Sequence, residues 1–169
     1  MPLGDGGLVF EARTLAQGHP LTPLALRYVN RAIAQQRLDQ PIVEIGIWAG
    51  YALTNGYCLR RVEEHAAGLV LAAAEGVDLD LELDRLDEEA ARIAAELRGA
   101  EAGRHILGDE EETIAALDSI IAGEVERRLD HWRDSVDEAA WAELEEYIAW
   151  WVVKGYALRV AEMSTGAVA

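Results

Sequence analysis

Apolar residues recur at helical spacing along most of this chain, and these recurrences predict where its helices lie. Leu26, Val29 and Ile33 mark a first helix that begins after Thr22, a favoured N-cap, with Pro23 in the first helical position. A second helix is expected from about residue 41 to 66. It is apolar nearly all round between residues 42 and 59, which is typical of a central helix that is covered on most sides.

Three further helices are predicted in the second half of the chain. An apolar stripe of helical spacing indicates one over residues 80–98. Asp109 with Glu112, and Ser135 with Glu138, match the capping-box pattern that begins a helix. We therefore expect a fourth helix to begin after Asp109 and a fifth to span about residues 136–163.

The pattern predicts the fold class and the domain organisation. Residues 1–20 are rich in Gly and contain two Pro, so we expect an irregular N-terminal arm there. The remaining residues, 21–169, are enough for a single domain with a buried core. Because the connecting segments are short, neighbouring helices should lie antiparallel. The sequence therefore predicts an all-α bundle of about five mostly antiparallel helices.

Two ten-residue segments of the predicted helices resemble each other. NGYCLRRVEE at 55–64 and KGYALRVAEM at 154–163 share Gly, Tyr, Leu, Arg and Glu in the same order, 99 positions apart. Duplication of a helical hairpin and convergence of two apolar helices both explain the similarity, and the fading of the match beyond these segments favours convergence. Under either explanation, we expect each Gly-Tyr pair to mark a close helix crossing and each Arg to mark the point where a helix reaches solvent.

Small and aromatic residues indicate a surface for protein association. Glycines gather on one face of the second helix, where another helix can approach closely. The fifth helix is rich in aromatic residues, and its two adjacent tryptophans point about 100° apart, so they need covering from two directions. The residues expected at an interface between chains are Gly46, Gly50, Gly56, Trp150, Trp151 and Tyr156.

The net charge of −16 changes the range of partners. It opposes binding to nucleic acid and to anionic lipid, because both carry negative charge. The chain contains no long uncharged apolar run and no basic leader before an apolar segment, so neither a membrane span nor a secretory signal is expected. We therefore expect a cytoplasmic protein whose partner is itself or another protein.

Polar residues in apolar surroundings are the remaining candidates for chemistry. Glu44, Asn55 and Lys154, the only lysine, are candidate buried polar groups, and their clustering would make a small-ligand pocket between the second and fifth helices. Cys58 is the only cysteine, and no Cys/His spacing for zinc exists. The sequence predicts no metal site and no cofactor.

One motif carries an enzymatic alternative. Arg60 and His65, in RRVEEH, are separated by four residues. This spacing resembles the Arg-x4–6-His motif of the HEPN family of helical RNases and nucleotide-modifying toxins. The resemblance implies that Arg60 would stabilise a phosphate and that His65 would act as acid or base near a dimer cleft. With no other catalytic constellation in the chain, the sequence favours a non-enzymatic protein that acts through association, as a homo-oligomer or a small subunit of an assembly.

Overall fold

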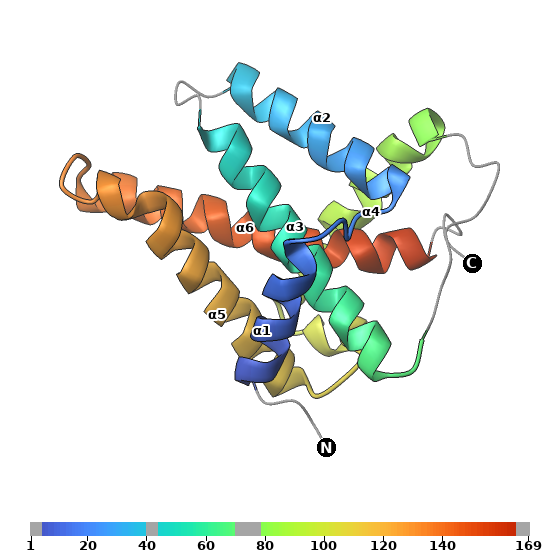
Figure 1. Cartoon of the computed structure of the whole chain (residues 1–169). Helices are drawn as coiled ribbons and strands as arrows, with labels where there is room; N and C mark the ends of the chain where they lie inside the picture. Colours follow the sequence, from blue (N-terminus) through green and yellow to red (C-terminus); the bar gives the residue numbers. More distant parts are fainter. Residues whose placement is uncertain (1–4, 40–43, 70–78, 165–169) are drawn as a thin grey trace.

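The computed structural model describes residues 5–39, 44–69 and 79–164, and every regular element within these ranges is helical (Figure 1). The six α-helices are α1 (Asp5–Ala16), α2 (Pro23–Asp39), α3 (Ile45–Ala66), α4 (Leu79–Leu97), α5 (Glu110–Leu129) and α6 (Glu138–Ser164). Two short 3₁₀ helices, η1 (Ala102–His105) and η2 (Asp130–Trp132), flank α5. The prediction of an all-α fold is confirmed.

Two of the predicted helix starts are confirmed, and one is wrong. The Thr22 hydroxyl accepts the backbone N–H of Ala25 at 3.1 Å, and the Asp109 carboxylate accepts the N–H of Glu112 at 3.0 Å. At the start of α6, however, the cap is Asp137 and not Ser135: its carboxylate accepts the N–H of Ala140 at 2.8 Å. Asp and Ser are about equally good N-caps, so the sequence pattern alone does not separate them.

The irregular N-terminal arm expected over residues 1–20 is wrong for most of its length. Residues 5–16 form α1, which packs against α3 and α5. Its apolar residues Leu8, Val9 and Ala12 are buried in the core. The two glycines in its first turn weaken a helix in isolation, and burial of these three side chains stabilises it instead. The domain therefore includes α1.

Helices α3 and α6 cross at the centre of the fold, and the other helices surround them (Figure 1). Gly56 and Gly155 allow the crossing. A Cβ built on Gly56 would lie 1.9 Å from the carbonyl oxygen of Val152, and one on Gly155 would lie 2.1 Å from that of Leu53. The prediction that each Gly-Tyr pair marks a close helix crossing is therefore confirmed, and the two pairs meet at the same crossing.

The helices divide into two sets of three with matching contacts. In the first set α1 and α2 pack on α3, and in the second α4 and α5 pack on α6. Between the sets, α3 contacts α6. The contact of α1 with α5 corresponds to that of α4 with α2, and the contact of α3 with α5 corresponds to that of α6 with α2. Each helix of residues 5–66 thus has a counterpart of the same role in residues 79–164. No helix in the described ranges is long and apolar enough to cross a membrane.

Candidate functional site

A buried polar cluster lies where the side chain of Tyr57 meets α6. The Tyr57 hydroxyl donates to Glu162 at 2.6 Å and accepts from the Arg159 guanidinium at 3.0 Å. Arg159 also donates to Glu162 at 2.6 Å and to Glu64 at 2.8 Å. The Thr22 hydroxyl, which caps α2, donates to Glu162 as well. The cluster therefore joins the start of α2 to α3 and α6, through hydrogen bonds and ion pairs that have little contact with water.

A second cluster lies where the side chain of Tyr156 meets α3. The Arg60 guanidinium donates to the Tyr156 hydroxyl at 2.9 Å and to the backbone carbonyl of His105. Glu63 accepts from the hydroxyl of Thr113 near the start of α5. The two clusters are built from corresponding residues, 99 positions apart in the sequence. Tyr156 corresponds to Tyr57, Arg60 to Arg159 and Glu63 to Glu162.

These contacts overturn the expected role of the two arginines. Arg60 and Arg159 do not reach solvent; they are 8% and 3% exposed. Although burial lowers it, hydrogen bonding to Glu64 and the surrounding negative charge hold the pKa of Arg159 above its ordinary range. Burial raises the pKa of the Tyr57 and Tyr156 hydroxyls well above their usual value, so both phenols stay protonated and can donate. The clusters hold the crossing together through buried charges that pair or hydrogen-bond inside the chain, although Arg60 Nε and Glu63 Oε1 make no hydrogen bond within the described residues.

The structure does not bring Arg60 and His65 to one site. Arg60 is buried against Tyr156, whereas His65 is exposed in the last turn of α3. A phosphate bound by both side chains would require Arg60 to leave Tyr156 and the His105 carbonyl. The contacts of Arg60 within the chain therefore differ from the phosphate contact that the HEPN-like motif implied.

The three polar candidates Glu44, Asn55 and Lys154 also lie apart. Glu44 is exposed at the start of α3. Asn55 is buried and donates to Glu124 of α5 at 3.1 Å. Lys154 is 8% exposed, and its ammonium lies 2.9 Å from the Asp87 carboxylate of α4. Although burial raises it, hydrogen bonds from Tyr28 and Lys154 lower the pKa of Asp87 below its ordinary range.

Most residues expected at an interface between chains pack inside this one. Gly46 and Gly50 face Ile33 of α2: a Cβ on either would lie 2.6 Å from an Ile33 atom. Gly56 faces α6, Tyr156 is fully buried and Trp151 is 8% exposed. Trp150 is half-buried. Other helices of the same chain therefore cover most of the glycine and aromatic residues for which the sequence pattern favoured a second chain.

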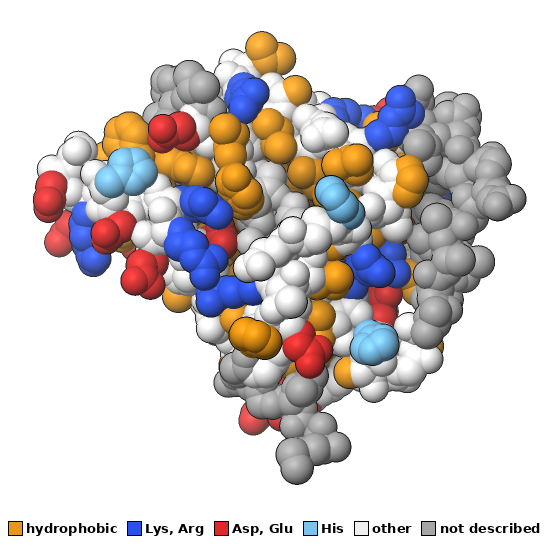
Figure 2. All heavy atoms as spheres, in the orientation of Figure 1, with side chains coloured by type: hydrophobic (Ala, Val, Ile, Leu, Met, Phe, Trp, Pro, Cys, Tyr) orange, Lys and Arg blue, Asp and Glu red, His pale blue; other side chains and the backbone are white. Residues whose placement is uncertain are grey.

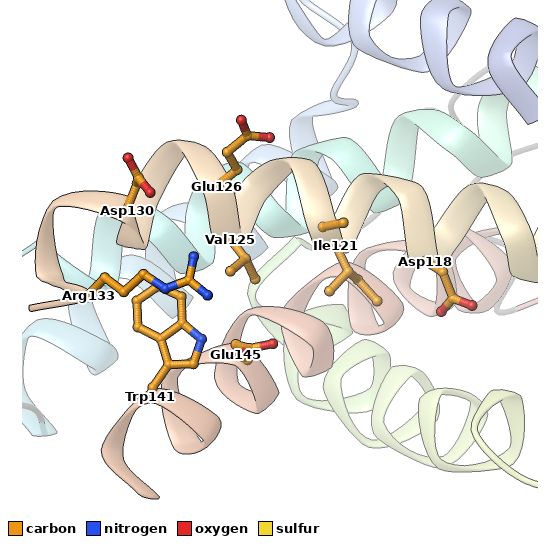
Figure 3. A pocket seen from close by; sticks show the side chains of 9 residues that line it. Asp118, Ile121, Val125, Glu126, Asp130, Arg133, Trp141 and Glu145 are labelled. Atoms are coloured by element: carbon orange, nitrogen blue, oxygen red, sulfur yellow. The ribbon is translucent and has the colours of Figure 1, made fainter. Parts of the chain in front are cut away.

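A surface groove lies between α5 and the N-terminal part of α6 (Figure 3). Its cavity measures about 320 Å³. Figure 3 shows Ile121 and Val125 pointing from α5 towards α6 and the Arg133 guanidinium beside the Trp141 indole; that guanidinium carbon lies 5.1 Å from the ring centroid. Four exposed carboxylates line the groove: Asp118, Glu126, Asp130 and Glu145. The groove therefore combines an apolar floor with an acidic edge.

The groove continues towards the corner formed by α4 and η1. A second cavity of about 500 Å³ shares Asp118 and Ile121 with the first, and it reaches Leu97 and Ala102. Glu110 adds another carboxylate to its edge. Of the arginines in the described ranges, Arg98 alone lines this second part, and it forms an ion pair with Glu146. We call the two cavities together the α5–α6 groove.

The sequence contains a row of acidic residues that marks this groove, but only the apolar stripe of the same helix entered the sequence prediction. Asp118 and Glu126 of α5 fall in one row with Ala122 and with Asp130, the first residue of η2, at steps of four residues. Such a row lies along one face of a helix. Each carboxylate on its own is typical of a solvated helix face, and only the splayed packing of α5 and α6 places the row beside an apolar floor. On the face shown in Figure 2, acidic side chains lie among basic ones at the end of the molecule where α5 meets α6.

Comparisons of the chain with protein-family models, with curated proteins and with solved structures gave no match.

Proposed function

We propose that this protein acts by binding another protein, and that the α5–α6 groove receives a basic amphipathic helix of that partner. The observation that supports the proposal is the combination of an apolar floor with an edge of four exposed carboxylates. Helical segments dock by laying an apolar face into a groove of this kind, with charges along the edge fixing orientation and register.

The chemistry of the edge defines the partner. Apolar residues at helical spacing would contact Ile121, Val125 and Trp141, and lysines or arginines beside them would meet Asp118 and Glu145. The overall charge of −16 adds long-range attraction for a cationic partner and repels an anionic one. A non-enzymatic role agrees with the first cluster at the helix crossing, where the buried Arg159 already pairs with Glu64 and Glu162.

The same charge argues for a partner other than a second copy. A copy that docked an acidic helix in this groove would place like charges together, at a cost to the free energy of association. Light scattering over a concentration series, at low and high salt, separates the two cases. A monomer that forms a complex only with a basic segment supports the proposal, and a stable homodimer with the groove covered contradicts it.

The direct test uses a designed helical peptide of leucine and lysine, in which leucines form one face, with a glutamate-for-lysine version as control. Calorimetry at two salt concentrations should give one binding site for the lysine peptide, weaker at high salt, and no binding of the glutamate peptide. Glu145→Lys and Asp118→Lys should each weaken binding roughly fivefold or more, since each replaces attraction by repulsion.

A matched variant separates the groove from the general negative charge. Glu143 is exposed on α6 but does not line the groove, so Glu143→Lys changes the net charge equally. It should leave affinity nearly unchanged. If Glu143→Lys weakens the lysine peptide as much as Glu145→Lys does, the attraction is unspecific and the groove is not the site.

A further inference from the structure

A cavity of about 390 Å³ lies between α1 and the C-terminal part of α3. It shares no lining residue with the α5–α6 groove. Phe10 and Leu15 of α1 and Val62 of α3 give it apolar walls. The Phe10 side chain is 71% exposed, although it is among the largest apolar side chains of the chain. A cavity of this size is within the range of small-molecule sites.

Two basic side chains line the same cavity. Arg61 and His65 come from successive turns of α3. Arg61 donates to the backbone carbonyl of Pro20, and within the described parts of the chain no carboxylate forms an ion pair with Arg61 or His65. Several other arginines of this acidic protein, such as Arg31, Arg98 and Arg159, have carboxylate partners.

Two polar side chains, Glu11 and Thr14, line the α1 side of the cavity. Thr14 donates its hydroxyl to the backbone carbonyl of Phe10 at 2.9 Å, so its donor is used within α1. Glu11 is exposed and lines the cavity. In Figure 2, basic side chains and a histidine lie over the C-terminal part of α3, next to hydrophobic side chains. Basic groups thus stand on the α3 side and an acid on the α1 side.

We propose that this cavity binds a small monocarboxylate with an apolar tail, of the fatty-acid class. The carboxylate would accept hydrogen bonds from Arg61 and His65, because a guanidinium presents donors that match a carboxylate. The tail would cover Phe10, Leu15 and Val62. This site is independent of the proposed groove for a protein partner, and either can fail without the other.

The test titrates the whole chain with decanoate below its micelle concentration and follows backbone amide signals by NMR, with calorimetry for the affinity. Decanol and decyltrimethylammonium are the matched probes with the same tail. Shifts confined to residues around Phe10, Leu15 and Val62, with decanoate bound more tightly than the cation, support the proposal. In a chain of net charge −16, unspecific binding would favour the cation instead.

Variants separate the carboxylate contact from hydrophobic binding. Arg61→Gln should weaken decanoate roughly tenfold and leave decanol unchanged, because only the carboxylate uses the guanidinium. Glu11→Gln should tighten decanoate by removing a like charge. Arg104→Gln, at an exposed arginine that lines neither this cavity nor the α5–α6 groove, is the control and should change neither. Thermal unfolding of each variant verifies that it is folded.

Three results would overturn the proposal: no decanoate shift at the cavity, equal decanoate affinity in Arg61→Gln, or preferential binding of the cationic probe. Vesicles of anionic phospholipid form the last arm of the experiment. Binding to vesicles with loss of the same signals, in the absence of decanoate binding, would assign the surface to a membrane rather than to a free carboxylate.

Discussion

Gly56 of α3 and Gly155 of α6 each face the backbone of the other helix, at positions related by the same shift along the sequence. The atom nearest to a Cβ on Gly56 is the carbonyl oxygen of Val152, and the atom nearest to one on Gly155 is the carbonyl oxygen of Leu53. Val152 stands 99 positions after Leu53, as Gly155 does after Gly56. The two helices therefore meet through a reciprocal contact, as two equivalent units would across a twofold axis.

This contact predicts that neither glycine tolerates a methyl group. Gly56→Ala and Gly155→Ala would each place a Cβ about 2 Å from a backbone carbonyl oxygen, so the helices must separate. Each substitution should lower the free energy of unfolding by about 3 kcal/mol or more, measured by urea denaturation followed by circular dichroism.

Gly123→Ala is the matched control. Gly123 also lies within a helix, but the nearest obstacle to its Cβ is the end of the flexible Arg13 side chain rather than backbone. Removing a glycine from a helix interior stabilises it by up to ~1 kcal/mol, so this variant should be neutral or slightly more stable. Equal losses at all three positions would mean that the helix crossing is not the cause.

Helix positions were predictable from the sequence because they depend on local pattern. The apolar stripes and the caps at Thr22 and Asp109 act over a few residues, and the structure confirms the helices they mark. The first helix was missed because its glycines oppose helix formation locally, whereas burial of Leu8, Val9 and Ala12 by distant helices stabilises it.

The direction in which a side chain points depends on tertiary contacts, and here sequence reasoning failed. Arg60 and Arg159 stand near helix ends, where arginine normally reaches water, and only the arrival of Tyr156 and Glu64 from the other helix provides buried partners. The glycines of α3 were correctly expected to receive a helix, but not one from the same chain. Matching contacts in both sets of three helices favour duplication over convergence as the origin of the repeated decapeptide, and the unit that repeats is three helices rather than a hairpin.

Removing either central hydroxyl should destabilise the fold by a similar amount. Tyr57→Phe leaves Arg159 and Glu162 without one hydrogen-bond partner, and Tyr156→Phe does the same to Arg60. Each should lower the free energy of unfolding by about 1–3 kcal/mol, because the groups left behind are buried. Chemical denaturation measures both. A loss at Tyr57 with none at Tyr156 would show that only one of the two clusters supports the crossing.

The Asp87 carboxylate should make part of the stability sensitive to acid. Its pKa is lower in the folded chain than the ordinary value of about 4, so its contribution is present above that value and is lost as the pH falls through the folded pKa. Denaturation between about pH 6 and pH 3 should therefore show a smaller decline for Asp87→Asn than for the unchanged chain. The double variant Asp87→Asn with Lys154→Met should recover stability at neutral pH, since it removes the buried ammonium that Asp87→Asn leaves unpaired.

Cys58 should report on opening of the core. It is fully buried, and burial raises the pKa of its thiol to about 12. Because the thiolate is the reactive form, a disulfide reagent should modify the native chain very slowly at neutral pH and the unfolded chain at once. The reaction rate across a denaturant series should follow the unfolding transition. Rapid modification without denaturant would contradict the packing of α3.

Arg133 should compete with a basic partner for the α5–α6 groove. Its guanidinium covers the Trp141 ring. Among the described residues, Arg133 is the only arginine that lines the cavity of about 320 Å³, beside four carboxylates. A lysine of the partner would contact the same carboxylates as Arg133, and an apolar residue of the partner would contact the same indole. Arg133→Ala should therefore tighten binding of the leucine–lysine peptide several-fold. Arg104→Ala removes the same charge from an exposed site outside the cavity and should have a smaller effect. Weaker binding by Arg133→Ala would mean that the arginine holds Trp141 in place for the partner, and equal gains from both variants would reduce the effect to net charge.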